Sequence, residues 1–442
     1  MYHNFARPLL IWFLSLSVSL FISLALVSYG NASDDDLKPN IFNSNLKVEP
    51  VIRGLHAPTA MAFIGPDDIL VLEKNNGKVE RITNGYKLTE PLLDVDVSYA
   101  AERGMLGITI AENETNNSNP YVFLYYTKSE TNGDEKIYNS AYSVSNHLYR
   151  YELVNESKLQ NPKLLLSTPS TVNPFHLGGK LLIGPDHNIY ITTGDQIRLK
   201  SNQAQNIKNG AFPDTTSGIL RITLDGQAPS DDILGKNYPL NLYYAYGIRN
   251  SFGIDFDPVT GKLWDAELGP SYGDEINLVE PGFNSGWSRV QGIWSPRDTI
   301  GRYDLTIRNK LLNPDNLVDF DGKGKYSTPE FIWKNPACVT AIKFLASDKY
   351  GKEYKDDVFV GTSVGNLYHF DMNKNRTGFN LTDEIADTNS RQELAQIQFG
   401  DKFGAITDMQ VSPYDGFLYI VSLDGAIYKL VPKDIKLTED NN

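Results

Sequence analysis

The chain repeats one strand–turn–strand unit six times, and this recurrence limits the possible folds more than any other feature. Each copy has an apolar strand, a turn rich in Pro, Asp or Gly, a second apolar strand and a short further strand. The copies lie at 61–82, 108–153, 181–226, 254–279, 342–370 and 409–430. One such unit cannot bury both faces of its sheet, whereas units stacked around a ring can, as in a β-propeller.

The sequence therefore predicts an all-β fold, a six-bladed β-propeller preceded by an N-terminal signal or anchor segment. Helical periodicity is nearly absent after that segment, and the units are rich in β-branched and aromatic residues. A strand near residues 46–52 is expected to close the ring by pairing with the last blade. A pair of β-sandwiches is the alternative, but it does not explain six similar units.

The first 32 residues are typical of an export signal. No charged residue lies between Pro8 and Tyr29, and a lone Arg7 precedes the apolar run 9–27. Gly30-Asn31-Ala32 offers a small-x-small cleavage site, whereas a run of about 19 apolar residues would also span a bilayer. Cleavage and retention as a membrane tether both stay open. In either case we expect the rest of the protein outside the cell, secreted or anchored at the surface.

The chain divides into a signal peptide or anchor (1–32), a linker (33–45), the propeller (46–432) and a polar tail (433–442). Asp and Glu outnumber Lys and Arg by 54 to 41, giving a net charge of −13. With no basic stripe to reverse this balance, the surface would repel nucleic acid, and we expect no such partner. The only cysteine, Cys338, excludes an internal disulfide and is expected to be a small buried side chain.

Two polar positions precede equivalent strands of the third and fourth units. His176, in NPFHLGGKLLIG, lies at a loop-to-strand junction, where an imidazole can act as a general base. A structural or merely exposed histidine is the alternative. Asp195 and Gln196 end the next strand and could lie beside it. Arg249 and Asn250 occupy the matching place in the fourth unit, where a guanidinium could bind a carboxylate or an oxyanion, or form an ordinary salt bridge.

Oxygen ligands gather after the second strand of the fourth unit, within residues 267–277. The residues concerned are Glu267, Gly269, Pro270, Asp274, Glu275 and Asn277. Ca²⁺ takes six to eight hard oxygen ligands from carboxylates and carbonyl groups. Their spacing is not that of an EF-hand loop, so a calcium site is predicted here from ligand type alone.

Several ordered motifs resemble the glucose/sorbosone dehydrogenase family, the soluble quinoproteins that include PQQ-dependent aldose sugar dehydrogenases. The motifs are HLGGKLLIGPDHNIYITTGDQ, GILRITLDG, YAYGIRNSFGIDFDPVTGKLWDAELGP and GDEINLVEPGFNSGW, with LHAPTAMAF and ERGMLGITI nearer the front. Together they extend from about residue 48 to 432. The resemblance implies a six-bladed propeller, the cofactors PQQ and Ca²⁺, a small-molecule sugar substrate and an external electron acceptor.

The resemblance also implies roles for particular residues. His176 resembles the base that removes the proton of the sugar's anomeric hydroxyl, and Arg249 and Asn250 resemble the family's Arg-Asn pair, which contacts the quinone region. The expected cofactor neighbours are Glu102, Gln196 and Asn250. The expected metal ligands are Gly269 and Pro270, whose carbonyl groups would hold the calcium ion of PQQ, and Asp274 and Glu275, in a neighbouring structural calcium site.

Three usually cationic positions depart from the family pattern, and Leu268 stands at a position that is often His. Val364, Ala405 and Thr407 stand where the enzymes usually carry Lys or Arg, although PQQ has several carboxylates and its pocket needs cations. Lys402 or Lys334 could substitute. The sequence favours an exported PQQ-dependent dehydrogenase that oxidises an aldose to its lactone. The alternative is a non-catalytic cell-surface propeller of the same family that binds a protein or a glycan.

Overall fold

The computed structural model describes residues 38–113, 119–138, 144–170, 173–197, 213–270, 272–292, 317–388, 390 and 392–433. The chain splits into two units, Met1–Pro39 and Asn40–Asn442. The segment predicted as signal or anchor lies outside the described residues, as does the tail beyond 433. Within the described ranges, no helix is long and apolar enough to cross a membrane.

The described strands of the second unit form six sheets, numbered here in chain order. Sheet 1 contains β3 (Pro58–Gly65), β4 (Asp68–Glu73), β5 (Lys78–Thr83), β6 (Tyr86–Lys87) and β7 (Leu93–Asp94). Sheet 2 contains β8 (Met105–Ala111), β9 (Tyr121–Thr127), β10 (Ser145–Val154) and β11 (Lys158–Pro169). Sheet 3 contains β12 (Leu181–Ile183), β13 (Ile189–Thr193), β14 (Gly218–Ile222), β15 (Tyr243–Tyr246), β19 (Phe283–Asn284) and β20 (Lys325–Tyr326).

The remaining three sheets also have antiparallel inner strands, whereas β25 (Ile385–Ala386) of sheet 4, like β19 and β20 of sheet 3, pairs parallel to its neighbour. Sheet 4 contains β16 (Ser251–Phe256), β17 (Leu263–Glu267), β18 (Asp274–Val279), β21 (Phe331–Trp333) and β25. Sheet 5 contains β22 (Val339–Phe344), β23 (Val358–Thr362), β24 (Leu367–Phe370), β26 (Gln398–Asp401) and β1 (Asn40–Ile41). Sheet 6 contains β27 (Ile406–Val411), β28 (Leu418–Ser422), β29 (Ala426–Pro432) and β2 (Leu46–Arg53). Among the described residues, two short 3-10 helices, Leu240–Leu242 and Leu394–Gln396, complete the named elements.

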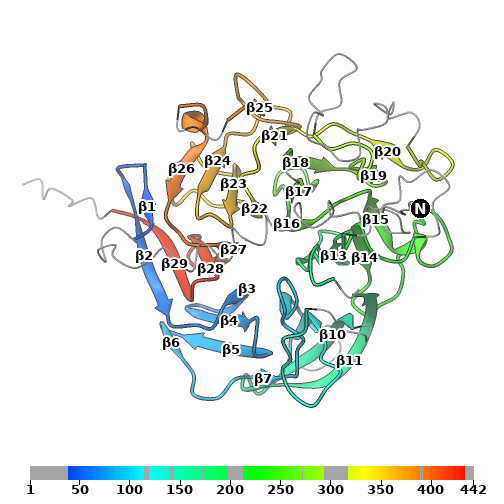
Figure 1. Ribbon diagram of the computed structural model, residues 1–442. Coiled ribbons are helices and arrows are strands. Elements are labelled where there is room, and N and C mark those ends of the chain that lie inside the picture. Colours follow the sequence, from blue (N-terminus) through cyan, green and yellow to red (C-terminus); the bar gives the residue numbers. More distant parts are fainter. Residues whose placement is uncertain are drawn as a thin grey trace, which may run out of the picture. The chain divides into compact units, whose positions relative to one another are not determined.

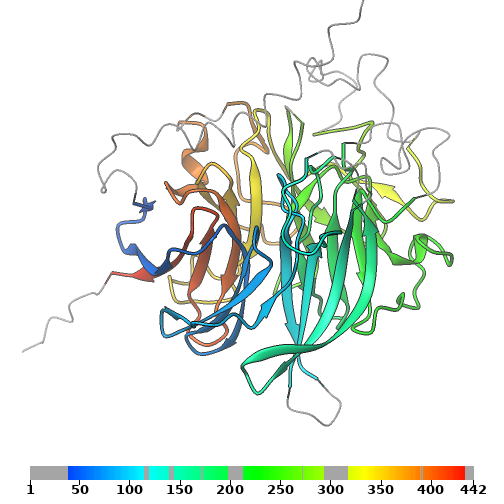
Figure 2. The ribbon, with the colours of Figure 1, turned by 60° about the horizontal axis from the view of Figure 1, so that its bottom comes forward.

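The sheets follow one another around a ring in chain order (Figure 1). The innermost strands are β3, β8, β12, β16, β22 and β27, one in each sheet: β3 contacts β8, β8 contacts β12, β16 contacts β22, β22 contacts β27, and β27 contacts β3. The ring passes from sheet 3 to sheet 4 through β13 and β16. Figure 2 turns the ring by 60° and shows its strands from the side. The predicted all-β class and propeller arrangement are confirmed.

Apolar side chains fill the space between neighbouring sheets. Each pair of adjacent sheets shares one buried cluster, such as the one in which Trp264 and Trp333 of sheet 4 meet Phe344 and Phe370 of sheet 5. The other clusters join sheets 5 and 6, 1 and 2, 2 and 3, 3 and 4, and 6 and 1. This pattern explains the apolar character of both faces of each unit, because every sheet is covered on two sides.

Strand β2 closes the ring, as predicted. It pairs antiparallel with β29, from Leu46 opposite Pro432 to Arg53 opposite Ala426. Its neighbour β1, which falls within the segment 33–45, pairs with β26 of sheet 5. The N-terminal strands of the ring are therefore held by strands from the end of the chain.

The innermost strands all begin at one end of the ring, which we call the upper end. Hydroxyl groups join their beginnings: Thr59 Oγ1 donates to the Met105 carbonyl at 2.8 Å, and Thr407 Oγ1 donates to the Pro58 carbonyl at 3.0 Å. Thr340 Oγ1 likewise donates to the carbonyl of Ile406. The strands finish at the opposite, lower end. His176 and Arg249, which precede β12 and β16, thus belong to the upper end.

Candidate active site

The structure brings His176, Asp195 and Arg249 together at the upper end. The Nδ1 atom of His176 lies 2.5 Å from Asp195 Oδ1, and its Nε2 atom lies 2.8 Å from Arg249 Nη2. The backbone supports this arrangement, because the Asp195 amide donates to the Arg249 carbonyl at 2.8 Å. The imidazole is mostly buried, with 13% of its surface exposed. Both of its nitrogens therefore have a charged partner.

These contacts determine which nitrogen of His176 carries the proton. A guanidinium can only donate, so Nε2 must accept a hydrogen bond from Arg249. The neutral imidazole then has its hydrogen on Nδ1, where it donates to the Asp195 carboxylate. Nε2 is thus the basic nitrogen, held in one orientation by the carboxylate behind it.

Asp195 is fully buried and ionised among hydrogen-bond donors. Its Oδ2 accepts from Trp287 Nε1 at 2.7 Å, and its Oδ1 accepts from the Ile197 amide at 2.9 Å. Burial acts to raise the pKa of Asp195, but the charge and hydrogen bond of His176 and the charge of Arg249 outweigh it, so the pKa lies below its usual value. A permanent carboxylate behind the imidazole stabilises its protonated form.

Arg249 is held by the loop that follows β17. Its Nη1 donates to the Leu268 carbonyl at 2.9 Å, its backbone amide donates to Glu267 Oε1 at 2.7 Å, and its guanidinium lies 5.6 Å from the centre of the Trp287 ring. Burial lowers the pKa of the guanidinium, opposed mainly by Asp195 and Glu102. The side chain is 8% exposed and remains a cation, since an arginine does not lose its proton in proteins.

Glu102 and Asn250 fix the loop that carries His176. Glu102 Oε2 accepts from the Leu177 amide at 3.1 Å and from Asn250 Nδ2 at 3.4 Å. Asn250 Oδ1 accepts from the Gly178 amide at 3.1 Å. Gln196 lies next to Asp195; its backbone amide donates to the His176 carbonyl at 3.3 Å, and its side-chain amide donates to the Pro169 carbonyl. All three predicted cofactor neighbours therefore lie around the His176 loop.

The turn after β17 is tight, as the Gly-Pro pair indicates. A side chain at Gly269 would place its Cβ 2.1 Å from the Tyr272 carbonyl oxygen, so only glycine fits. Both oxygens of Asp274 are engaged by backbone amides: Oδ1 by Gly269 at 2.9 Å, and Oδ2 by Cys338 at 2.6 Å and Val339 at 3.3 Å. Asp274 thus braces the turn against the start of β22, and burial raises its pKa to about 6.

Three carboxyl groups are fully buried together in sheet 4. Glu267 and Glu275 lie directly opposite each other on β17 and β18, and Asp265 lies opposite Asn277. Ser285 Oγ joins the two glutamates, at 2.7 Å from Glu267 Oε2 and 3.3 Å from Glu275 Oε2. Burial raises the pKa of Glu267 to about 7 and raises those of Asp265 and Glu275 well above their usual values. Like charges so placed need protons or a cation.

The oxygen atoms around these carboxyl groups are of the type that binds a hard cation. Asp265 Oδ2, Asn277 Oδ1 and Gln291 Oε1 are buried without a hydrogen-bond partner, and all three are acceptors that Ca²⁺ binds. In the described part of the chain, however, no three His, Cys, Asp or Glu side chains are grouped to ligate one ion directly. Calcium here would therefore need amide or backbone oxygens beside the carboxylates.

The family model described as glucose / sorbosone dehydrogenase matches residues 55–429, most of the ring. The chain belongs to this family. Quinoprotein glucose dehydrogenase B of Acinetobacter calcoaceticus is 31% identical over 300 residues, which cover 62% of this chain and 60% of that protein, less than two thirds of its length. Aldose sugar dehydrogenase YliI of Escherichia coli is 24% identical over 399 residues, covering 88% and 94%. The PQQ-bound aldose sugar dehydrogenase of Streptomyces coelicolor superimposes with a TM-score of 0.61 at 21% identity, covering 88% and 98%.

This glucose/sorbosone dehydrogenase family member has no cation at the three positions noted above. Val364 is 59% exposed, and Thr407 uses its hydroxyl to bind the Pro58 carbonyl. Of the two possible substitutes, Lys334 forms an ion pair with Asp387 at 2.6 Å, and Lys402 is exposed. The backbone carbonyl of Ala405 accepts from Leu423 at 2.8 Å.

The sequence did not single out Trp287 as a site residue, although it ends the conspicuous NSGW motif. Its indole donates a hydrogen bond to Asp195, which is 92 positions away in the sequence.

Cys338 is half-buried, and its backbone amide, not its thiol, contacts Asp274. Burial and the nearby Asp274 raise the pKa of the thiol to about 11, so it stays protonated near neutral pH.

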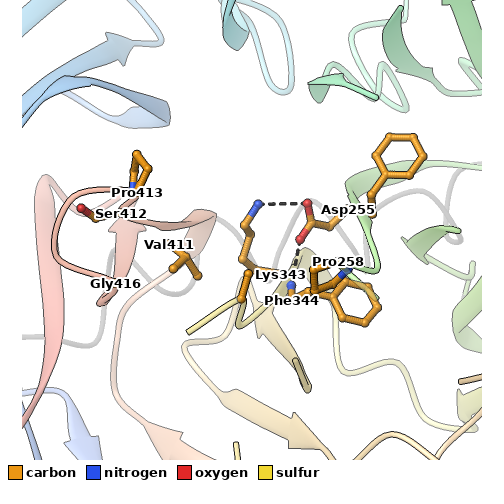
Figure 3. Close-up of a pocket in the computed structure, with 10 residues that line it drawn as sticks. Asp255, Pro258, Lys343, Phe344, Val411, Ser412, Pro413 and Gly416 are labelled. Carbon is orange, nitrogen blue, oxygen red and sulfur yellow. Dashed lines mark hydrogen bonds and ion pairs between the residues drawn. The ribbon is translucent and has the colours of Figure 1, made fainter. Parts of the chain in front are cut away.

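A separate pocket of about 370 Å³ lies at the lower end, where β16, β22 and β27 finish (Figure 3). Lys343 Nζ pairs with Asp255 Oδ1 at 2.9 Å, and Asp255 Oδ2 accepts from the Phe344 amide at 2.8 Å. Val411, Ser412 and Pro413 line the other side, so that Lys343 lies between them and Asp255. None of the predicted site residues lines this pocket.

Proposed function

We propose that this protein is a PQQ-dependent dehydrogenase of aldose sugars, with His176 as its general base. The observation that carries the proposal is the oriented imidazole, with Asp195 on Nδ1 and Arg249 on Nε2. The names of the relatives, a quinoprotein glucose dehydrogenase and an aldose sugar dehydrogenase, support the choice of cofactor and substrate class.

In the proposed reaction, the anomeric hydroxyl of the sugar gives its proton to His176 Nε2. The O–H bond breaks, the carbon–oxygen bond becomes the carbonyl of a lactone, and the Asp195 carboxylate stabilises the imidazolium. PQQ, when bound, would supply the two-electron oxidation by accepting the hydride from the same carbon, and the electrons would leave to an external acceptor. Arg249 must release Nε2 first, and its guanidinium then faces the developing negative charge on oxygen.

The residues around His176 would hold the cofactor and its metal. Asn250, Glu102 and Gln196 lie on its loop or beside it and offer amide and carboxylate groups. We infer that the carbonyl groups of Gly269 and Pro270 bind the calcium ion of PQQ. A second, structural calcium ion would relieve the repulsion between Glu267 and Glu275.

We also infer that each of the six sheets is one blade, so that the propeller has six blades. Export, with the segment 1–32 either cleaved or kept as a tether through residues 9–27, remains part of the proposal. An extracellular or cell-surface location agrees with oxidation of sugars outside the cell and with an external electron acceptor.

The test is a titration of purified protein with PQQ in the presence and absence of Ca²⁺, followed by sugar-dependent dye reduction. Wild-type protein should bind PQQ at micromolar concentration or tighter, and His176→Ala should lose turnover while keeping its melting temperature. His187→Asn, at an exposed turn of sheet 3, is the matched control and should retain turnover. Absence of PQQ binding by the wild-type protein would disprove the proposal.

A second candidate function is favoured by one observation. Val364, Ala405 and Thr407 supply no positive charge for a polycarboxylate cofactor. A non-catalytic cell-surface propeller that binds a protein or a glycan would show no PQQ binding. It would keep its calcium-dependent stability, which separates it from a protein that has simply failed to fold.

A further inference from the structure

Lys180 connects opposite sides of the ring at the upper end. It precedes β12 of sheet 3, and its ammonium group forms an ion pair with Asp408 on β27 of sheet 6. Sheets 3 and 6 lie three places apart in the ring, so this pair spans the ring axis. The two side chains are 10% and 1% exposed. A buried cation thus lies on the axis, in the segment that carries His176.

Hydrogen bonds fix the backbone from Gly178 to Lys180. The amides of Gly179 and Lys180 both donate to Thr192 Oγ1 at 3.0 Å, and the Gly178 amide donates to Asn250 Oδ1 at 3.1 Å. A Cβ at Gly179 would lie 2.6 Å from Leu106 Cβ, so the strands approach closely there. Lys180 is therefore linked to the His176 loop by a rigid connection.

Asp408 does not depend on Lys180 for its hydrogen bonds. Its Oδ2 accepts from the Met61 amide at 3.0 Å, and its Oδ1 accepts from the Met409 amide at 2.9 Å. Gln410 Nε2 lies 3.2 Å from both carboxylate oxygens. Neutral donors thus already disperse the negative charge, and an ammonium group has three hydrogens of which Asp408 needs one.

Lys180 also lies next to two of the positions where the chain has an uncharged residue. Asp408 directly follows Thr407, and neither Thr407 nor Ala405 carries a charge. Lys334 is paired with Asp387, away from this pair, and Lys402 is exposed. Lys180 therefore brings a cation from sheet 3 to Asp408 on β27, beside the two uncharged positions.

We propose that Lys180 is a cofactor-binding residue whose ammonium group, held on the axis by Asp408, binds a carboxylate of PQQ. The inference rests on the proposed function, since it concerns the same upper-end site. The ligand class is a planar polycarboxylate, and Lys180 supplies one charge-assisted hydrogen bond to it. Asp408 is a positioning residue that acts through Lys180.

The test compares PQQ dissociation constants, measured by calorimetry with Ca²⁺ present, for wild-type protein and variants of the pair. Lys180→Met keeps the length of the side chain without its charge and should raise the dissociation constant about 10- to 100-fold. Lys180→Arg should stay within about 5-fold of wild type, because the charge is kept. Asp408→Asn should weaken binding less than Lys180→Met does, because Lys180 keeps its charge and loses only the partner that positions it.

A matched lysine at the lower end provides the control. Lys343→Met removes the ammonium of the lower pocket and should leave the PQQ dissociation constant unchanged. Melting temperatures establish that each variant folds. If Lys180→Met does not fold, Lys180→Arg still tests the inference, because a roughly 10-fold weaker affinity of Lys180→Arg for PQQ would contradict a role for the charge. Equal PQQ binding by Lys180→Met and wild type would overturn the inference. Equal weakening in Lys180→Met and Asp408→Asn would also overturn it, because it would show that the ion pair only stabilises the ring. If the wild-type protein binds no PQQ, the proposed function fails first and this inference with it.

Discussion

The two ends of the ring use charged residues differently. At the upper end, the imidazole of His176 is held between Asp195 and Arg249, and the three groups are joined to a tryptophan and to backbone amides from several segments. At the lower end, Lys343 and Asp255 form a pair beside the pocket. The upper groups are oriented by several partners each, whereas the lower pair joins two neighbouring strands.

This difference indicates which charges serve chemistry and which serve the fold. An ion pair that satisfies a backbone amide, as Asp255 does for Phe344, stabilises the contact between two sheets. An imidazole that keeps its basic nitrogen toward a cation, with a buried carboxylate behind it, gains little for stability from that arrangement. It is, however, what proton transfer requires.

The largest effect is expected from Asp195→Asn at the upper end. The amide has only one acceptor oxygen, so it cannot accept both the Nδ1 hydrogen of His176 and the indole hydrogen of Trp287. The imidazole is then no longer held in the tautomer with a basic Nε2, and its protonated form loses a stabilising carboxylate. Turnover with sugar, PQQ and dye should fall by roughly 10²- to 10⁴-fold, with PQQ binding changed far less. Stopped-flow or steady-state dye reduction measures the fall. Turnover within 3-fold of wild type would show that Asp195 does not orient the base.

Calcium should have the next largest effect, through the buried carboxyl groups of sheet 4. Ca²⁺ at one hundred times its dissociation constant should add about 2.7 kcal/mol to the free energy of unfolding. Thermal unfolding with Ca²⁺ and with a chelator measures this. Glu275→Gln should remove most of the calcium response, whereas Asp255→Asn at the lower end should keep it. An identical melting temperature with and without Ca²⁺ would contradict a site here.

Asp255→Ala should change stability without changing chemistry. The substitution leaves the Phe344 amide and Lys343 without their partner and should cost about 1 to 3 kcal/mol of unfolding free energy. Chemical denaturation measures the loss. Turnover per folded molecule should equal that of wild type, and a selective loss of turnover would show that the two ends are coupled.

The smallest effect concerns Glu330, a half-buried acid that binds the Leu278 amide where β18 nears the lower end. Burial raises its pKa in the folded protein to about 8, well above its usual value. The folded state thus holds this proton more tightly than the unfolded state, so the associated stability is present at low pH and is lost as pH rises from about 4.5 to 8. Glu330→Gln should flatten this part of the stability profile by on the order of 1 kcal/mol, after allowance for solvent. An unchanged profile would show that folding does not raise the pKa of Glu330.

Much of the fold followed from the sequence because it depends on local repetition. The apolar strands, their turns and the closing strand near residues 46–52 are each visible in short stretches, and the ring is the arrangement that buries them all. His176 and Arg249 were identified for the same reason, since both precede the first strand of a unit. Asp195 could be placed beside His176 because it ends the next strand.

Contacts across the ring could not be predicted in this way. Lys180 and Asp408 are 228 positions apart, and nothing near either residue indicates the other. Asp274 was expected as a metal ligand from its residue type, yet its oxygens bind three backbone amides. Which atoms a carboxylate faces depends on the final packing of several segments, and composition alone does not contain that information.

The pairing of β2 with β29 has a consequence for how the chain is made. Strand β2 leaves the ribosome among the first segments of the ring, and its partner β29 is among the last. Throughout synthesis β2 therefore presents an unpaired edge, the kind of surface on which chains aggregate or exchange strands. The ring can lock only when the whole chain has been released, so shortening either end of residues 46–432 should leave a molecule open at sheet 6.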